Sequence, residues 1–413
     1  MPWQGCVLIS RIRFPGSPHH LGGQVGPHWA IFGAVLHQCL HSSVEQGGFL
    51  NRGKTTSRQA QCRLCPNEER IGRAQVDLEL SLLFWALWPA AMKHVIDWLL
   101  EPSQPAVRYL ALRDLVEGTG RRELENARRD IATRGWAKDV LTKQKPGGNW
   151  LDKEEDLYRP KYVSTNWMLL LLSDLGVTKD NPRIAKACSL WMDTYAGPDG
   201  GFDTPGAKNS EHCLVGNTAR ALIKFGYTDE LRVKSALDLL VKTQKADGGW
   251  HCFPSSTGTI DAWEGMSAFA VYPRQEWTRG MKAAVEKGAE FFLERRLYRQ
   301  GSRYDPWIRL HFPYHYYYDI LVGLDFMTAL GYGDESRLKP ALSHLRKKRR
   351  GDGTWGLDAV HPDFYDERWP RWRSKYEKYY TSFSLERAGR PSKMITLRAL
   401  TVLKRVGEFS TRR

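Results

Sequence analysis

The residues best suited to acid–base chemistry are Asp261 and Glu264, in the segment Asp261-Ala-Trp-Glu264. Residues three apart share one face of a helix, and a neighbouring carboxylate raises the pKa of the other. A buried carboxylic acid with a raised pKa can donate a proton to a substrate. The alternative interpretation is structural, because an acidic residue at a helix N-terminus is stabilised by the helix dipole.

The densest group of aromatic residues lies between Trp307 and Asp319 and includes two histidines. Aromatic faces stabilise cations, and His311 and His315 are candidate catalytic residues. The alternative is that these rings only fill a narrow core. We expect the segment to line a substrate cavity, and its predicted cavity residues are Trp307, Phe312, Tyr314, Tyr318 and Asp319.

A repeat of about fifty residues supplies the scaffold for these groups. Gly-rich turns ending in an aromatic residue recur at Trp150, Phe202, Trp250, Tyr304 and Trp355, in steps of 52, 48, 54 and 51 residues. Apolar residues between the turns have helical spacing, and glycine favours helix ends. The pattern predicts six helical hairpins, with first helices near 93–100, 121–143, 181–195, 229–244, 278–297 and 334–349, and second helices near 104–117, 162–175, 212–226, 259–272, 314–331 and 391–406.

The second helices are the more apolar set, and their N-terminal ends carry polar or aromatic residues. This favours an all-α fold in which the second helices form the inner layer of a closed double ring. An open solenoid is the alternative, although its repeats usually have about 33–47 residues. Predicted cavity residues at the starts of the inner helices are Tyr162, Thr165, Trp167, Asn217, Arg220, Trp263 and Lys393.

The turns 144–150 and 244–250, which begin with Gln and end with Trp, resemble the QW-type repeat of the terpene cyclase and protein prenyltransferase superfamily. The resemblance covers roughly residues 93–407, and is greatest to small, single-toroid, squalene-cyclase-like proteins of prokaryotes. It implies an (α/α)6 toroid that binds or transforms an isoprenoid or similar apolar substrate in its central cavity. Neither the Asp-x-Asp-Asp nor the Asp-Asp-x-x-Asp motif of terpene cyclases occurs, so a non-catalytic binding or scaffold toroid is the alternative.

A zinc-dependent, transferase-like enzyme is a second alternative that the resemblance suggests. Protein prenyltransferases hold zinc with an Asp, a Cys and a His, and the segment Glu211-His-Cys213 resembles the Asp-x-Cys element with Glu in place of Asp. A toroid would bring Cys213, Cys252, His311 and His315 toward one rim, where three ligands and an open position would make the zinc catalytic. The predicted ligands are Cys213, Cys252 and His315. The spacing departs from that family, and buried cysteines acting as small apolar residues are the alternative.

Charge and composition define the remaining expectations. Of the net charge of +15, residues 337–413 contribute +12, with 20 Lys and Arg against 8 Asp and Glu. This basic part suggests peripheral membrane contact or a solvated surface, and Lys393 and Arg398 suit a diphosphate. Seven scattered cysteines in 413 residues favour a cytoplasmic protein.

The expected domains are an extension over 1–91, disordered or reflecting a misassigned start, and a toroid over 92–413. An aromatic and basic insert at about 356–390 reads as a lid or membrane contact, and we do not expect nucleic acid as a partner. The pair Cys62 and Cys65 in the extension is only weak evidence for a metal site.

Overall fold

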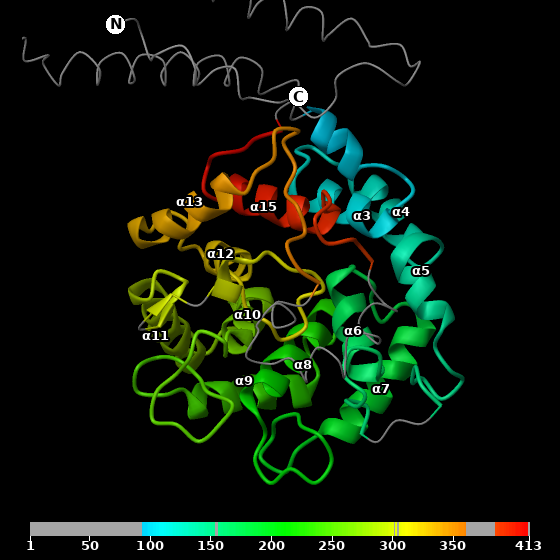
Figure 1. Cartoon of the computed structure of the whole chain (residues 1–413). Helices are drawn as coiled ribbons and strands as arrows, with labels where there is room; N and C mark the ends of the chain where they lie inside the picture. The colour runs from blue at the N-terminus through cyan, green and yellow to red at the C-terminus, as the bar shows by residue number, and fades with distance from the viewer. Residues whose placement is uncertain (1–92, 153–155, 301, 304, 361–384, 412–413) are drawn as a thin grey trace, which may run out of the picture. The chain divides into compact units, whose positions relative to one another are not determined.

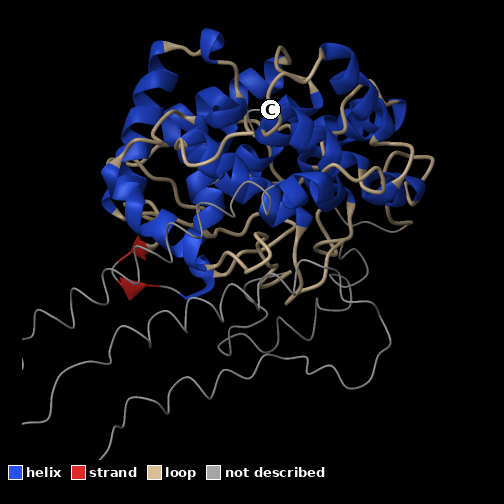
Figure 2. Ribbon diagram, turned by 90° about the horizontal axis from the view of Figure 1, so that it is seen from above, coloured by secondary structure: helices blue, strands red, loops and turns tan. Residues whose placement is uncertain are grey.

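The computed structural model describes residues 93–152, 156–300, 302–303, 305–360 and 385–411. The predicted extension over 1–91 and residues 361–384 of the predicted insert lie outside the described residues. Apart from the antiparallel pair β1 (Arg299–Gln300) and β2 (Ser302–Arg303), with Gln300 opposite Ser302, the described elements are helices (Figure 2). No helix in these ranges is long and apolar enough to span a membrane.

The helices form two layers, which confirms the prediction of an all-α toroid of helical hairpins (Figure 1). The inner layer consists of α3 (Pro105–Asp114), α6 (Thr165–Asp174), α8 (His212–Phe225), α10 (Glu264–Val271), α12 (Ile320–Ala329) and α15 (Lys393–Arg405). The outer layer consists of a helix over 93–99, α4 (Arg121–Asp130), α5 (Gly135–Thr142), α7 (Pro182–Tyr195), α9 (Leu231–Thr243), α11 (Arg279–Glu294) and α13 (Lys339–Lys347). Short 3-10 helices are η2 (Arg274–Glu276), η3 (Asp305–Ile308) and η4 (Ser336–Leu338).

The ring closes where the last inner helix meets the first. Helix α15 packs against α3, although the two are separated by almost the whole described chain. The Lys404 ammonium donates to the carbonyl oxygens of Asp114 (3.1 Å), the last residue of α3, and of Leu115 (2.9 Å), which follows it. A carbonyl at a helix C-terminus has no partner within its own helix, so a lysine from the neighbouring helix satisfies it. The structure is therefore a closed ring and not an open solenoid.

The distribution of apolar residues explains why each helix takes its layer. Every residue of α6, from Thr165 to Asp174, is buried, whereas the only buried residue of α4 is Ala127. A helix that is apolar all round must be enclosed by other helices, while an amphipathic helix covers them with one face.

The sequence-based boundaries were wrong at several helix starts. The helix expected over 121–143 is two helices, α4 and α5, divided next to Gly135, whose φ is +68°. Three inner helices begin later than predicted, at Thr165, Glu264 and Ile320. At the last of these, the Asp319 carboxylate accepts hydrogen bonds from two backbone N–H groups of the first turn, which fixes the start of α12.

The recurring Gly-rich turn has a constant geometry that explains its aromatic residue. The indole N–H of Trp150 donates to the carbonyl oxygen of Val140 (2.8 Å), and Trp250 donates in the same way to Leu240 (2.9 Å). In each case the indole N–H binds a carbonyl oxygen in the last turn of the preceding outer helix, ten residues earlier in the chain. In the second of these turns the amide of Gln244 donates to Gly248 of its own turn (2.8 Å) and to a carbonyl of the next outer helix (2.7 Å).

Candidate functional site

A cavity of about 760 Å³ lies at the N-terminal ends of the inner helices α6, α8 and α10. Its size is within the range of small-molecule sites. We call it the aromatic cavity. Its lining residues are Tyr158, Lys161, Asn166, Trp167, Leu170, Glu211, Cys213, Leu214, Asn217, His251, Cys252, Phe253, Thr259, Asp261, Ala262, Glu264, Trp307, Tyr316, Tyr317 and Tyr318. Eight of the predicted site residues are among them: Trp167, Cys213, Asn217, Cys252, Asp261, Glu264, Trp307 and Tyr318.

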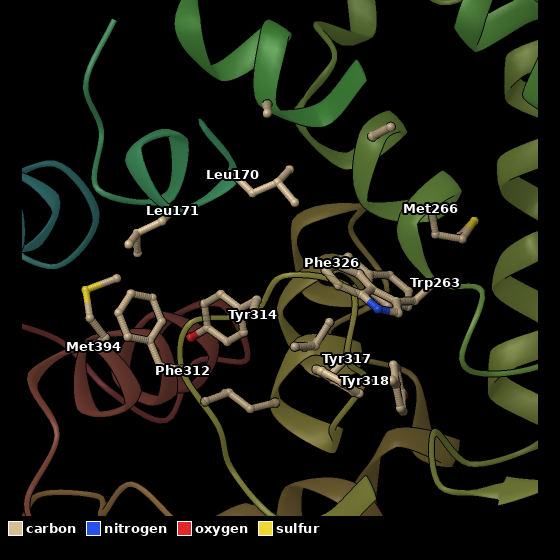
Figure 3. Close-up of a cluster of buried hydrophobic side chains, with 14 of the residues drawn as sticks. Leu170, Leu171, Trp263, Met266, Phe312, Tyr314, Tyr317, Tyr318, Phe326 and Met394 are labelled. Carbon is tan, nitrogen blue, oxygen red and sulfur yellow. The ribbon is translucent and has the colours of Figure 1, made fainter. Parts of the chain in front are cut away.

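One wall of the aromatic cavity is made of tyrosines whose hydroxyl groups are hydrogen-bonded together. The hydroxyl of Tyr317 lies 2.7 Å from that of Tyr316 and 2.9 Å from that of Tyr162. The Lys161 ammonium donates to the Tyr316 hydroxyl (3.3 Å) and lies 4.9 Å from the centre of that ring. Tyr317 and Tyr318 extend this wall along the segment before α12 (Figure 3). Tyr162, predicted to line the cavity, is 1% exposed and joins this wall through its hydroxyl group, but it is not among the lining residues.

Backbone strain accompanies this wall. Tyr162 and His315 both have positive φ, at 73° and 46°, and their rings stack with centroids 5.6 Å apart. Residues other than glycine rarely take this backbone conformation, which costs of order 1–3 kcal/mol and is often found at functional sites. Burial lowers the pKa of His315 to about 3, so its imidazole is neutral at physiological pH. His315, a predicted catalytic residue, thus contacts the tyrosine wall as a neutral imidazole, and it is not among the residues that line the aromatic cavity.

Glu264 is the buried acidic group of the aromatic cavity. It is 1% exposed, and neither carboxylate oxygen has a hydrogen-bond partner among the described residues. Burial raises the pKa of Glu264 well above its usual range, and the nearby Cys252 adds to this, while the positive charge of Arg220 opposes it. Charged carboxylates without partners are costly to bury, so this environment favours the neutral acid form of Glu264.

Gly216 explains how Glu264 comes to be buried. A Cβ atom at Gly216 would lie 2.6 Å from the backbone carbonyl carbon of Glu264, closer than any side chain allows. The absence of a side chain lets α8 and α10 approach closely at the first turn of α10. This close packing removes the Glu264 carboxyl group from water.

Asp261 does not share a helix face with Glu264, because α10 begins only at Glu264. Its side chain is exposed, and one carboxylate oxygen accepts a hydrogen bond from the indole N–H of Trp307 (2.6 Å). The two carboxylates of the predicted pair therefore differ in environment. Asp261 fixes Trp307 at the rim, where the surrounding protein also raises the pKa of Asp261, and Glu264 is the more deeply buried of the two.

His311 has a structural role, although it was predicted to be catalytic. Its Nδ1 lies 2.6 Å from a carboxylate oxygen of Asp319, and its Nε2 lies 3.3 Å from the carbonyl oxygen of Tyr314. Both ring nitrogens are thus occupied, and the pair His311–Asp319 is fully buried. Phe312 packs against Tyr314, with ring centroids 5.4 Å apart. His311, Phe312 and Asp319 hold the segment before α12 in place and do not line the aromatic cavity.

Two further predicted cavity residues bind neighbouring parts of the backbone. The hydroxyl oxygen of Thr165 accepts a hydrogen bond from the backbone N–H of Trp150 (3.3 Å), which joins α6 to its turn. The Lys393 ammonium donates to the carbonyl oxygen of Trp98 and pairs with Glu101 (2.9 Å). Both residues stabilise the ring. Three others, Arg220, Trp263 and Tyr314, line a separate cavity at the opposite ends of the inner helices.

The predicted zinc ligands are only partly brought together. The thiols of Cys213 and Cys252 are hydrogen-bonded, which raises the pKa of Cys213 and lowers that of Cys252. His315 contacts Tyr162 and Trp167 instead. Within the described ranges no group of three or more His, Cys, Asp or Glu side chains could hold a metal ion. The two cysteines alone do not make the three-ligand site expected of catalytic zinc.

Several lining residues were not predicted from the sequence. Tyr158 and Lys161 lie in the irregular segment before α6, where no periodicity indicates the direction of a side chain. Asn166 is 1% exposed, and its side-chain amide has no hydrogen-bond partner in the part of the chain that the structure describes. Tyr316 and Tyr317 belong to the aromatic segment 307–319, so a sequence signal was present for these two residues.

Comparisons with known proteins find low similarity to solved structures. No family model matches it, and no curated protein matches it. Among solved structures it is similar to the type II terpene cyclase MstE from Scytonema, in complex with its substrate geranylgeranyl dihydroxybenzoate: 17% identity and a TM-score of 0.39, covering 75% of this chain and 88% of that one. The apo structure of MstE gives 16% identity and the same TM-score over 75% of this chain and 89% of that one. These scores are low, so we base the function proposed below on the residues of this chain.

Proposed function

We propose that the protein is an enzyme that transforms an isoprenoid or a similar apolar substrate in the aromatic cavity, with Glu264 as the proton donor. The observation that carries this proposal is a buried carboxyl group, without a hydrogen-bond partner among the described residues, that borders a ligand-sized cavity with seven Tyr, Trp and Phe residues in its lining. A carboxylic acid without a protein partner keeps its proton available for a substrate.

The chemistry follows from these groups. Glu264 would transfer its proton to one carbon of a substrate double bond, whose π electrons form the new C–H bond. The other carbon becomes a carbocation, and Glu264 becomes a carboxylate. The faces of Trp167, Trp307 and the tyrosine wall supply the negative potential that stabilises such a cation. Loss of a proton from the carbocation to the Glu264 carboxylate would form a new double bond and restore the acid.

The cavity rim supports an apolar substrate. Phe253 lines the aromatic cavity and is 68% exposed, which is unusual for a large apolar side chain. An exposed phenylalanine at the mouth gives an apolar substrate a favourable path from a lipid surface or a carrier. Peripheral membrane contact, expected from the basic C-terminal part, is consistent with this position and belongs to the same proposal.

Turnover by the full chain tests the proposal. Farnesol, geranylgeraniol and squalene would be incubated with the wild-type protein, with Glu264→Gln and with Glu276→Gln, and extracts analysed by gas chromatography and mass spectrometry. Glu276 is exposed and outside the cavity, so its variant is the matched control. We expect isomerised or cyclised product from the wild type and the control, and at least a hundredfold less from Glu264→Gln, as for loss of a general acid. Equal turnover by Glu264→Gln would contradict the assignment, and substrate binding without turnover by the wild type would favour the non-catalytic alternative.

A further inference from the structure

A second cavity, of about 320 Å³, lies at the C-terminal ends of the inner helices. All six inner helices, α3, α6, α8, α10, α12 and α15, contribute residues to it, so it lies within the ring on the side opposite the aromatic cavity. We call it the polar cavity. The proposed function does not use it.

The charges that line the polar cavity are unbalanced. Four cations, Arg220, Lys224, Arg398 and Arg405, face two carboxylates, Asp174 and Asp325. The remaining cations of its lining have acidic partners nearby: Arg113 is paired with Asp114, and Arg128 with Asp180. The central network therefore has an excess of two positive charges, which is costly to hold in a partly enclosed space.

The two carboxylates are already shared between cations. One oxygen of Asp174 accepts from Arg220 (3.1 Å) and from Lys224 (2.6 Å), and lies 3.7 Å from Arg398. Asp325 in turn is paired with both Arg398 and Arg405. A network evolved only for stability would gain more from matched charges than from cations that share carboxylates.

The pKa of Lys224 reflects the other cations close to it. Burial lowers the pKa of Lys224 to about 8, and although Asp174 opposes this, Arg220 and Arg398 lower it further. A lysine with a pKa this low marks a region where further negative charge would be stabilising.

Polar atoms next to this network are also unused. The Nε of Arg220, the hydroxyl of Tyr314 and the second oxygen of Asp174 are buried and have no hydrogen-bond partner among the residues that the structure describes. Arg220 is 3% exposed and Tyr314 is 1% exposed. Buried polar groups are nearly always paired, so a bound group is the expected partner of these atoms.

We infer that the polar cavity binds a phosphate or diphosphate group carrying about two negative charges. Its oxygens would accept hydrogen bonds from the arginines, from Lys224 and from Tyr314, and a protonated phosphate oxygen would donate to Asp174. The excess of two positive charges matches the charge of the ligand. Free phosphate, free diphosphate and the head of a prenyl diphosphate share this chemistry.

Calorimetry on the full chain tests the inference. Inorganic phosphate, inorganic diphosphate and geranyl diphosphate would each be titrated into the wild type and into Tyr314→Phe, Lys224→Gln and Arg232→Gln at constant chloride. Arg232 lies on the outer helix α9, paired with Asp193 (2.7 Å), so its variant removes the same charge outside the cavity. Since the Tyr314 hydroxyl has no partner in the described chain, Tyr314→Phe should melt at or above the wild-type temperature without ligand.

We expect saturable binding of at least one of the three ligands by the wild type and by Arg232→Gln. Affinity should fall about tenfold or more in Tyr314→Phe and in Lys224→Gln, the factor for one hydrogen bond to a charged group. Binding of geranyl diphosphate alone, with the same losses, would support the site and identify a prenyl ester as its source. No saturable binding of any of the three, or equal affinity in the two cavity variants and the wild type, would overturn the inference.

Discussion

The replacement Glu264→Gln should make the protein more stable at neutral pH while it removes the proposed proton donor. Because the folded pKa of Glu264 lies well above the ordinary value of 4.5, the unfolded chain releases this proton first as pH rises. The contribution of Glu264 to stability is therefore fully present below pH 4.5 and is lost as pH rises toward the folded pKa. The loss is about 1.4 kcal/mol for each pH unit.

The magnitude at pH 7 follows from this slope. Over the roughly 2.5 pH units between the ordinary pKa of glutamic acid and neutrality, the wild type loses at most about 3.5 kcal/mol that Glu264→Gln keeps. Glutamine has nearly the size of protonated glutamic acid, so the two proteins should have similar stability at low pH. The difference in free energy of unfolding between the two proteins should increase steadily as pH rises.

Melting temperature measured from pH 4 to pH 8 checks this prediction. The control is Glu276→Gln, which removes an exposed carboxylate from η2 and should follow the wild-type curve. If the curves of the wild type and Glu264→Gln stay parallel throughout, Glu264 is ionised in the folded protein, and the reasoning about its burial is wrong.

Three further changes test how the ring positions this site. Trp250→Phe removes the indole N–H that donates to the carbonyl oxygen of Leu240 and leaves that carbonyl unsatisfied in the core. It should lower the free energy of unfolding, measured in urea melts, by about 2–4 kcal/mol. A loss under about 0.5 kcal/mol would contradict the role of the turn. Gly216→Ala forces a methyl group against the backbone of Glu264 and should destabilise the folded protein by about 1–3 kcal/mol. It should also flatten the pH dependence of the free energy of unfolding. An unchanged pH dependence would show that the close approach of the two helices does not bury Glu264. Lys404→Met removes the hydrogen bonds from Lys404 to the carbonyl oxygens of Asp114 and Leu115 at the ring closure, of which Leu115 keeps its bond from the Thr411 hydroxyl, and should cost about 1–3 kcal/mol. Equal protease resistance of variant and wild type would argue against closure through this contact.

The architecture could be predicted from the sequence because it depends on local patterns that repeat. The aromatic ends of the Gly-rich turns at Trp150, Trp250 and Trp355 each cap the preceding helix in the same way. The layer of each helix followed from whether it is apolar on one side or on all sides. Both signals are present in a few consecutive residues.

The site was harder to predict, because it is built largely by irregular segments before the inner helices. Tyr162 has a positive φ, and nothing in the sequence marks this conformation. Asp261 and Glu264 look alike in sequence, yet the start of α10 leaves one exposed and one buried. The polar cavity collects a few residues from each of six helices, and a charge network of that kind has no sequence spacing of its own.

The incorporation of solvent hydrogen into product tests the central claim most directly. The full chain would be incubated with farnesol, geranylgeraniol and squalene in D₂O, and the products analysed by mass spectrometry and NMR. If Glu264 protonates a double bond, the product contains one deuterium at the carbon that received the proton, and Glu264→Gln forms none of it. A product that carries only hydrogens of the substrate would contradict protonation, and with it the role we give to the buried carboxylic acid.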